Sequence, residues 1–447
     1  MEKEKKKKQQ GLFEAYLIPM TSRLLKIPYL RAIRESVYVM MPIIMMLAII
    51  NMVGNLVLNP NGPVMSESGL GLGTFLSGGL RDQAYRDSDF YRSMMTYIEY
   101  LNITYFLYYL IFSVIFTGRL AKLWHVDRLP VILSTLTGYV FMLSIFTEGL
   151  ENISTYFHGR GFLLSLVIST VTVLAFKKFS NVSMLRTPLA NGLNHHLMSS
   201  MRHLLPLSCT VLLIIFVVLG WILFESNVGA LSTLIQQAFS QELAQNPLIA
   251  MGYEFFRRIF WWIGVNGNSL VFAWREAFYI PAQMSNELEG TSFIFTSEFF
   301  DAISVSLLGL AISIWVFSTH NRMRSISAYS MPSLILSINE PFLYGLPIVL
   351  NPLFLIPYVI APMVNVLIGY LAISSGIVPV FRHAIGSQAP VLLDGVIATG
   401  DLMGAVLQLV WLSVDIVIYT PFVIIFNLME QDKLIEESDP MEEVRQA

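Results

Sequence analysis

One carboxylate stands among turn-forming and apolar residues in the segment 337–352, which reads Ser-Ile-Asn-Glu-Pro-Phe-Leu-Tyr-Gly-Leu-Pro-Ile-Val-Leu-Asn-Pro. An ionisable group in apolar surroundings is costly, so Glu340 implies a function or a firm structural partner. Three prolines interrupt regular helix here. We therefore predict a broken or re-entrant segment in which Glu340 faces a polar cavity. The alternative is a carboxylate that backbone amides hold merely to shape the loop.

Two indoles precede a polar turn in the segment 261–269, which reads Trp-Trp-Ile-Gly-Val-Asn-Gly-Asn-Ser. The face of an indole can stack on a pyranose ring, while amides and a carboxylate can hydrogen-bond the sugar hydroxyls. This mixture is typical of a pocket for a small polar ligand. The predicted sugar-binding residues are Trp261, Asn266, Asn268, Asn339 and Glu340. The alternative for the indoles is an aromatic belt at the membrane interface.

Other common site chemistries find little support in the sequence. His195, His196 and His203 lie close together, but no convincing set of Cys, Asp or Glu ligands stands nearby, so we predict no metal site and no cofactor. Cys209 is the single cysteine, which excludes an internal disulfide and suggests a small core residue. Phosphate-binding loops, nucleophile elbows and zinc-protease motifs are also absent from the sequence.

The composition indicates that these candidate residues lie on membrane helices. The chain has 447 residues, of which 55% are hydrophobic and only 13% are charged, and its mean hydropathy is +0.61. So few polar groups cannot coat a water-soluble surface, which excludes a soluble enzyme. We predict an all-α integral membrane protein, because a bilayer must be the solvent for most of the chain.

Apolar runs of suitable length predict roughly ten membrane segments. The first half contains five of them, at about 36–57, 98–116, 129–146, 162–176 and 205–224. The second half is less regular, with an aromatic run at 255–264, a span at about 299–317, a Pro- and Gly-broken region at 331–349, and spans near 353–373 and 402–425. The two candidate site segments thus lie in the less regular half.

Lysine and arginine in the short loops predict the orientation, because cytoplasmic loops carry the positive excess. The chain opens with five lysines between positions 3 and 8, and later clusters follow at 119–128 and 177–202, whereas 225–247 carries no Lys or Arg. Arg81, Arg86 and Arg92 are an exception in the first outside loop. We predict a bacterial cell-membrane protein with both termini in the cytoplasm.

The run from Ile338 to Asn351, with its continuation Leu353 to Asn365, resembles the signature of phosphotransferase-system sugar permeases, the EIIC components. It is most similar to the branch for lactose, cellobiose and diacetylchitobiose. Weaker similarity extends from Tyr29 to Gly400 and beyond. The resemblance implies a homodimer of ten-helix subunits with re-entrant hairpins. It also implies that a sugar is carried inward and phosphorylated on its 6-hydroxyl by the phosphocysteine of a partner EIIB, which works with EIIA.

The resemblance carries over to particular residues and fails at others. In that family the carboxylate of the Asn-Glu-Pro motif contacts the sugar, and Glu340 and the indole of Trp261 match family positions. The family's Gly-Ile-His-Gly motif holds a histidine that is thought to assist phosphoryl transfer, whereas this chain has Asn266 there. An amide cannot act as a base, so Glu340 is the candidate catalytic residue. The family's Trp-Thr-Thr-Pro reads Ser-Gln-Ala-Pro from Ser387, which removes a second stacking surface.

The expected organisation is a basic tail with an interfacial helix at 1–28, an EIIC-like membrane domain at 29–427 and an acidic tail at 428–447. Leu12 to Leu25 pattern as the interfacial helix, although packing on the protein itself is an alternative. Within the membrane domain we expect a scaffold half at about 29–228 and a substrate-site half at about 229–427.

Three functions remain open, and the first is favoured. The chain is the membrane permease subunit of a sugar phosphotransferase, a sugar-binding membrane sensor derived from that scaffold, or an unrelated transporter or membrane enzyme. A permease requires separate phosphocarrier partners, because we find no self-contained catalytic domain in the sequence. A sensor would bind sugar without accumulating it. An unrelated transporter would be coupled to sodium or protons without any phosphoryl donor.

Overall fold

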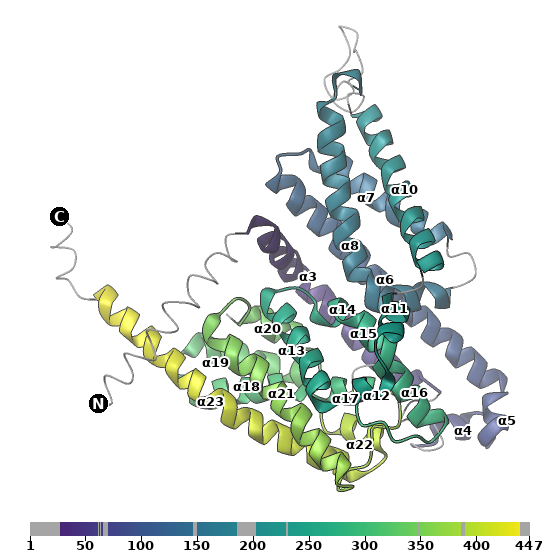
Figure 1. Ribbon diagram of the computed structural model, residues 1–447, viewed down its shortest axis with the longest axis vertical. Coiled ribbons are helices and arrows are strands. Elements are labelled where there is room, and N and C mark those ends of the chain that lie inside the picture. Colours follow the sequence, from purple (N-terminus) through teal and green to yellow (C-terminus); the bar gives the residue numbers. More distant parts are fainter. Residues whose placement is uncertain are drawn as a thin grey trace. The chain divides into compact units, whose positions relative to one another are not determined.

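The computed structural model describes residues 27–60, 62, 64–65, 70–145, 150–185, 203–228, 231–346, 348–385 and 389–438. These residues are almost all helical, and none of them forms a strand (Figure 1). The chain divides into two compact units. The N-terminal unit is Leu25–Ser240 with Gly264–Phe278, and the C-terminal unit contains Gln241–Ile263 and the described residues from Tyr279 onward. The predicted all-α class is confirmed.

The N-terminal unit is a layered bundle around the long helix α6. Helix α6 packs against α3, α7 and α8, and α10 packs against α7 and α8. Its elements are α3 (Pro28–Val53), η2 (Gly54–Leu58), α4 (Leu72–Leu76), α5 (Asp82–Arg86), α6 (Asp89–Leu123), α7 (Arg128–Ile145), α8 (Leu150–Asn181), η3 (Ser183–Leu185), α10 (Leu204–Val228), α11 (Leu231–Ala238), α14 (Gly267–Leu270), α15 (Phe272–Trp274) and η4 (Arg275–Tyr279).

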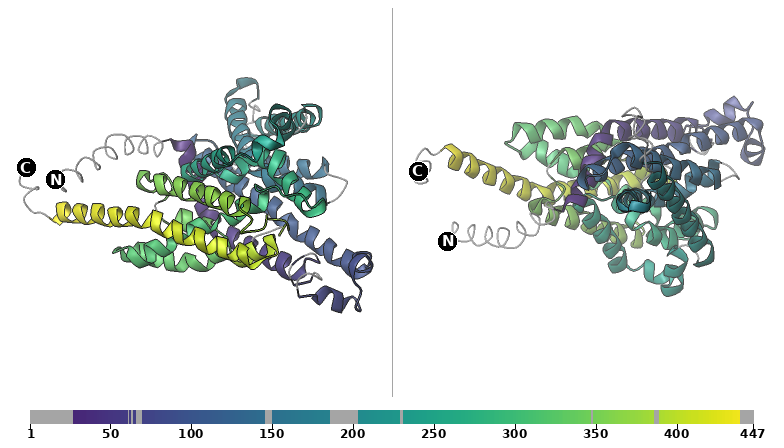
Figure 2. Two further views of the ribbon diagram at one scale, coloured as in Figure 1. Left: turned by 60° about the horizontal axis from the view of Figure 1, so that its bottom comes forward. Right: turned by 90° about the horizontal axis from the view of Figure 1, so that it is seen from above.

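The C-terminal unit contains helices of very unequal length. Helix α23 packs against α18, α21 and α22, while α13 packs against α21. The long α23 can be followed by its yellow colour in Figure 2. Its elements are α12 (Gln241–Ala244), α13 (Pro247–Ile263), α16 (Ile280–Leu288), α17 (Ser297–Ala302), α18 (Val305–Phe317), α19 (Asn321–Ile335), α20 (Glu340–Gly345), α21 (Pro352–Ser374), α22 (Leu393–Thr399) and α23 (Leu402–Ser438).

Six stretches of the described helices are long and apolar enough to cross a membrane. They are Phe106–Leu123, Gly161–Asn181, Leu204–Trp221, Ser297–Phe317, Pro352–Ser374 and Leu402–Met429. A seventh is the pair Pro28–Met40 and Pro42–Asn51, bent by 52° where Pro42 removes a helix hydrogen bond. The expected number of about ten segments therefore stays a prediction.

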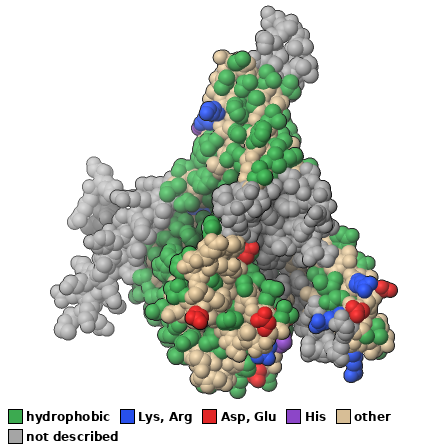
Figure 3. All heavy atoms as spheres, turned by 45° about the vertical axis from the view of Figure 1, so that its right-hand side comes forward, with side chains coloured by type: hydrophobic (Ala, Val, Ile, Leu, Met, Phe, Trp, Pro, Cys, Tyr) green, Lys and Arg blue, Asp and Glu red, His purple; other side chains and the backbone are tan. Residues whose placement is uncertain are grey.

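The surfaces of the candidate spans are apolar, as lipid contact requires. Phe216 on α10 and Val417 on α23 are 69% and 70% exposed. On the face drawn in Figure 3, hydrophobic side chains cover much of the described surface, and the charged side chains gather in a few places. Membrane insertion accounts for this exposure, which would be unfavourable in water.

Some sequence expectations fall outside the described residues. These are the helix at Leu12–Leu25, His195, His196, Ser387 and the end of the acidic tail. His203 is described, and its Nε2 lies 3.0 Å from Asp127 Oδ2. Within the described ranges, no group of three or more His, Cys, Asp and Glu side chains is arranged to hold a metal ion. Cys209 is half-buried in α10.

Candidate functional site

The segment 337–352 is broken, as its prolines predict. Helix α19 ends at Ile335, α20 is only six residues long and α21 begins at Pro352. The backbone is left-handed at Ser337 (φ 58°) and at Leu350 (φ 57°), a conformation that L-residues rarely adopt. Within α20, Phe342 and Leu343 are 0% and 1% exposed. The short helix is therefore packed inside protein, where irregular backbone is tolerated in a membrane protein.

One side of the segment is attached to the chain before α22. The Val391 amide donates to the Ile335 carbonyl at 2.7 Å, and Ser337 Oγ donates to the Ala389 carbonyl at 3.2 Å. These bonds place residues 389–391 beside the turn that leads into Asn339. Ser337, the left-handed residue at the start of the segment, is thus held by a distant part of the same chain. Strained backbone at functional sites is usually held by its surroundings in this way.

The other side of the segment is attached to the end of α13 through Trp262. The Leu350 amide donates to the Trp262 carbonyl at 2.9 Å, and Trp262 Nε1 donates to the Asn351 carbonyl at 2.9 Å. Asn351 in turn caps α21, because its Oδ1 accepts from the Leu353 amide at 3.0 Å. The C-terminal end of α13 and the α20–α21 connection are therefore held together by both backbone and side-chain bonds.

The two neighbouring indoles have different environments. Trp262 is 2% exposed and cannot reach a ligand, whereas Trp261 is only half-buried and keeps part of its surface accessible. Gly264 ends this stretch with a φ of 91°, which glycine adopts without steric cost. Trp261, which is predicted to stack on a sugar, is thus the tryptophan of this pair whose ring has accessible surface.

Asn339 brings an unsatisfied acceptor to the head of α20. Its Oδ1 is buried and has no hydrogen-bond partner among the described residues. A buried acceptor without a partner costs about 1–3 kcal/mol, so it favours a site where a ligand donor can arrive. Glu340 follows directly in the chain, and its side chain lies outside what the structure describes. Its predicted cavity contact therefore stays a prediction.

Asn266 and Asn268 lie in the N-terminal unit, whereas Trp261, Asn339 and Glu340 lie in the C-terminal unit. Asn266 Oδ1 accepts from the Ser269 amide at 3.1 Å and so caps the short helix α14. That bond occupies the oxygen of the amide. Asn268 is exposed. The predicted role of the two asparagines therefore rests on the sequence.

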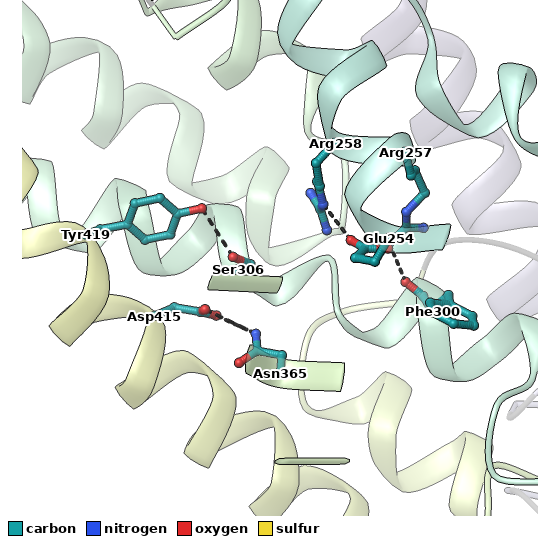
Figure 4. A network of polar contacts seen from close by, with 8 residues as sticks. All are labelled: Glu254, Arg257, Arg258, Phe300, Ser306, Asn365, Asp415 and Tyr419. Carbon is teal, nitrogen blue, oxygen red and sulfur yellow. Dashed lines mark hydrogen bonds and ion pairs between the residues drawn. The ribbon is translucent and has the colours of Figure 1, made fainter. Parts of the chain in front are cut away.

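The described structure reveals a buried charge cluster on α13 that the sequence analysis missed. Glu254 lies 2.7 Å from Arg257 and 2.6 Å from Arg258, and the three side chains are 0–5% exposed (Figure 4). Arg257 also donates to the Phe300 carbonyl at 2.9 Å. The guanidinium carbon of Arg258 lies 5.5 Å from the centre of the Tyr358 ring. The sequence signal that could have revealed this cluster is the spacing of opposite charges by three and four residues beside an aromatic run.

A second missed pair joins α21 to α23. Asn365 Nδ2 lies 2.9 Å from Asp415 Oδ2 and 3.1 Å from its Oδ1. On the neighbouring turn of α23, the hydroxyl of Tyr419 lies 3.2 Å from Ser306 Oγ on α18 (Figure 4). A lone carboxylate in an apolar span, such as Asp415, is by itself a sign of a structural or functional site. The C-terminal unit is thus crossed by buried polar contacts from α13 to α23.

Comparison with known proteins decides the family. The family model "Phosphotransferase system, EIIC" matches residues 34–362. The chain belongs to this EIIC family. The match includes the segments 261–269 and 337–352. The resemblance inferred from Ile338 to Asn351 is therefore confirmed.

Several bacterial EIIC proteins are similar to parts of the chain. The oligo-beta-mannoside-specific EIIC component of Bacillus subtilis (strain 168) is 30% identical over 210 residues, which are 42% of this chain and 46% of that protein. The cellobiose-specific EIIC component of Lactococcus lactis subsp. lactis (strain IL1403) is 25% identical, over 49% of this chain and 51% of that protein. The lactose-specific EIICB component of Staphylococcus aureus (strain N315) is 24% identical, over 72% and 59%. The EIIC chain thus spans about half the length of these curated relatives.

The fold is also that of a solved EIIC structure. The transporter ChbC, the IIC component from an N,N'-diacetylchitobiose-specific phosphotransferase system, matches with a TM-score of 0.53 at 20% identity. The match covers 96% of this chain and 100% of ChbC. It confirms the predicted EIIC fold.

Proposed function

We propose that this EIIC chain is the membrane permease subunit of a phosphoenolpyruvate-dependent sugar phosphotransferase system. It binds a disaccharide of the cellobiose, diacetylchitobiose or lactose class and translocates it for phosphorylation by a partner EIIB that EIIA recharges. The observation that carries the proposal is the family match over both candidate site segments. The permease is a homodimer in the bacterial cell membrane, with both termini in the cytoplasm.

Sugar binding follows from the side chains at the head of α20 and the end of α13. The half-buried indole of Trp261 stacks on the apolar face of a pyranose ring. The unpartnered Oδ1 of Asn339 and the carboxylate of Glu340 accept hydrogen bonds from sugar hydroxyls. A site of this kind rejects an analogue that lacks the hydroxyl, because its acceptor would again be left without a donor.

Phosphoryl transfer requires a group that accepts the proton of the sugar hydroxyl. As the hydroxyl oxygen bonds to phosphorus, the bond from phosphorus to the EIIB cysteine breaks, and the hydroxyl proton passes to the Glu340 carboxylate. Asn266 replaces the family's histidine and cannot take this proton. Its oxygen accepts from the Ser269 amide, so its NH₂ group is the part that donates to a sugar oxygen. The proposed roles of Asn266 and Asn268 rest on the family resemblance alone.

Uptake by membrane vesicles that contain the chain tests the proposal. Vesicles are given radiolabelled cellobiose, lactose or diacetylchitobiose with and without the phosphocarrier proteins and phosphoenolpyruvate. Sugar 6-phosphate inside the vesicles, formed only with the carriers, is the expected result. Sugar binding without any phosphorylated product would instead identify a sensor. Accumulation that needs sodium or protons and no phosphoryl donor would identify an unrelated transporter.

A further inference from the structure

Trp262 makes specific contacts that a sugar-stacking role does not explain. Its side chain is 2% exposed, so it does not touch a ligand from the accessible side of α13. Its indole nitrogen and its carbonyl nevertheless both bond to the chain that follows α20, at Asn351 and Leu350 respectively. The indole therefore joins the helix of Trp261 to the segment of Asn339 and Glu340.

Helix α13 is a firm support for such a junction. About one turn before Trp262, Arg257 is bonded to the Phe300 carbonyl of α17, and Arg258 lies over the ring of Tyr358 on α21. Glu254 pairs with both arginines. Removing a member of a buried ion pair is strongly unfavourable, so these contacts resist sliding or rotation of α13. The position of Trp262 is thus set by α17 and α21.

The α20–α21 connection needs an external support. Leu350 is left-handed there, with a φ of 57°, although it has a Cβ that disfavours this conformation. The bond from its amide to Trp262 and the adjoining indole bond to the Asn351 carbonyl hold the connection in place. On the other side of the connection, the six residues of α20 lead back to Asn339. A shift of the connection would therefore move the head of α20.

We propose that Trp262 is a positioning residue, which sets the place of the Asn339–Glu340 turn relative to the indole of Trp261. The proposal rests on the function proposed above. Trp261 stacks on the sugar, and Trp262 does not touch it. The hydrogen bond of the Trp262 indole fixes the distance between Trp261 and the Asn339–Glu340 turn. A pair of adjacent tryptophans thus divides into one ligand contact and one structural link.

Trp262→Phe tests the proposal, with Trp411→Phe as the matched control. Both tryptophans are buried in the C-terminal unit, at 2% and 0% exposure. Trp411 Nε1 has no hydrogen-bond partner among the described residues, whereas Trp262 Nε1 donates to Asn351. Both substitutions remove the same volume, and only Trp262→Phe removes a hydrogen bond to the connection. The full-length variants are purified, and their affinities for cellobiose, lactose and diacetylchitobiose, their melting temperatures and their amide hydrogen exchange are measured.

Trp262→Phe is expected to weaken cellobiose binding about tenfold relative to Trp411→Phe, at similar melting temperatures. The amides of residues 348–351 and of Leu353 should exchange faster in Trp262→Phe alone. Equal affinity and equal exchange in the two variants would overturn the proposal. If the unaltered protein binds none of the three sugars, the proposed function fails, while faster exchange in Trp262→Phe would still support the link between α13 and the connection.

Discussion

Buried polar side chains differ in kind between the two units. In the N-terminal unit they are mostly hydroxyls, such as Ser113, Thr117, Ser165 and Thr172, all 0% exposed. In the described part of the C-terminal unit they include charged groups. These are Glu254, Arg257, Arg258, Glu298, Asp394 and Asp415. No charged side chain of the described N-terminal unit is buried to this degree.

The difference follows from how each kind of group can be satisfied. A hydroxyl can bond to the carbonyl one turn back on its own helix, as Thr172 does with Ile168 at 2.6 Å. A buried charge needs a partner of opposite sign or several donors, and Glu254 has two arginines of its own helix as partners. The N-terminal unit thus satisfies its buried hydroxyls through carbonyls of the same helix and through hydroxyls of a neighbouring helix, as in the pair Thr117–Thr135. The C-terminal unit maintains costly groups around a broken segment, which favours it as the functional unit.

The largest expected effect is on stability, when the carboxylate of Glu254 that pairs with two arginines loses its charge. Glu254→Gln keeps the shape of the side chain but leaves Arg257 and Arg258 buried without their carboxylate partner. We expect the free energy of unfolding to fall by about 3–5 kcal/mol. Thermal and denaturant unfolding of the purified protein measures this loss. A change no larger than that of a buried hydroxyl substitution would remove the distinction between the units.

Asn266→His adds an ionisable group to the N-terminal unit at the position of the family's histidine. If a missing base limits phosphoryl transfer, the rate of sugar phosphate formation should rise about a hundredfold. The rate is measured in vesicles with saturating phosphocarriers. Asn181→His is the control, because Asn181 is an exposed asparagine of the same unit that has no proposed contact with the sugar. No gain, or the same gain in both variants, would show that Asn266 is not the limiting residue.

Glu340→Gln should weaken sugar binding about 10–100-fold, since hydrogen bonds to a charged group contribute about 1.5–3 kcal/mol. Equilibrium binding of labelled cellobiose to the purified protein measures the affinity. Glu289→Gln, at an exposed position of the same unit, is the matched control. Unchanged affinity in Glu340→Gln would exclude the carboxylate from the site.

Asp394 should make the stability of the C-terminal unit depend on pH. Burial, and then the charge of Asp301, raise the pKa of Asp394 from 3.8 to about 7, against a bond from Gln408 that lowers it. The folded state therefore keeps a proton that the unfolded chain has lost. Stability should fall as the pH rises from about 4 to about 7 and then level off, with a loss of roughly 1 kcal/mol between about pH 6 and about pH 8.

Several other ionisable groups lie on segments that contact α22 or its C-terminal end, and their titration needs to be separated from that of Asp394. They are Glu298 and Asp301 on α17, Asp401 at the turn into α23, and Arg382 and His383 in the chain that bonds to the Ala398 carbonyl. Asp394→Asn removes the titration of Asp394 and leaves the other ionisable groups in place. Melting temperatures across the pH range should then be flatter than in the unaltered protein. The same slope in both proteins would assign the titration to another group.

The smallest effect is expected in the hydroxyl network of the N-terminal unit. Tyr139→Phe removes the contacts of Tyr139 OH with Ser113 and Ser165. Ser165 keeps its bond to the Gly161 carbonyl at 2.7 Å, so it is not left unsatisfied. We expect a loss of about 1 kcal/mol or less in unfolding free energy. A loss as large as that of Glu254→Gln would contradict the division between packing hydroxyls and cross-linked charges.

The helical elements of the fold were predictable where the apolar pattern was continuous. The spans expected at 353–373 and 402–425 correspond to Pro352–Ser374 and to Leu402–Met429. The aromatic run expected from Phe255 is instead part of α13, which begins at Pro247. Glu254, Arg257 and Arg258 lower the local hydropathy, so the apolar pattern did not predict the start of this helix. The three charged side chains are buried because they pair with one another. Hydropathy measures single residues and does not register such pairs.

The candidate site was predictable in part. The sequence located the broken segment, since prolines and one carboxylate act locally on the backbone and its solvation. It selected Trp261 only through the family resemblance and assigned no role to Trp262, because adjacent residues of one type have the same chemistry. Their roles depend on which ring meets the chain that follows α20.

The sequence by itself determined a helical membrane protein of the EIIC type, with a break before α21. Composition, proline positions and a motif suffice for this, because solvent preference and backbone limits act residue by residue. Only the tertiary structure decided that Trp262 bonds to Asn351, 89 positions away, and that Asp415 meets Asn365, 50 positions away. Such pairings depend on how distant helices pack, and no local pattern encodes them.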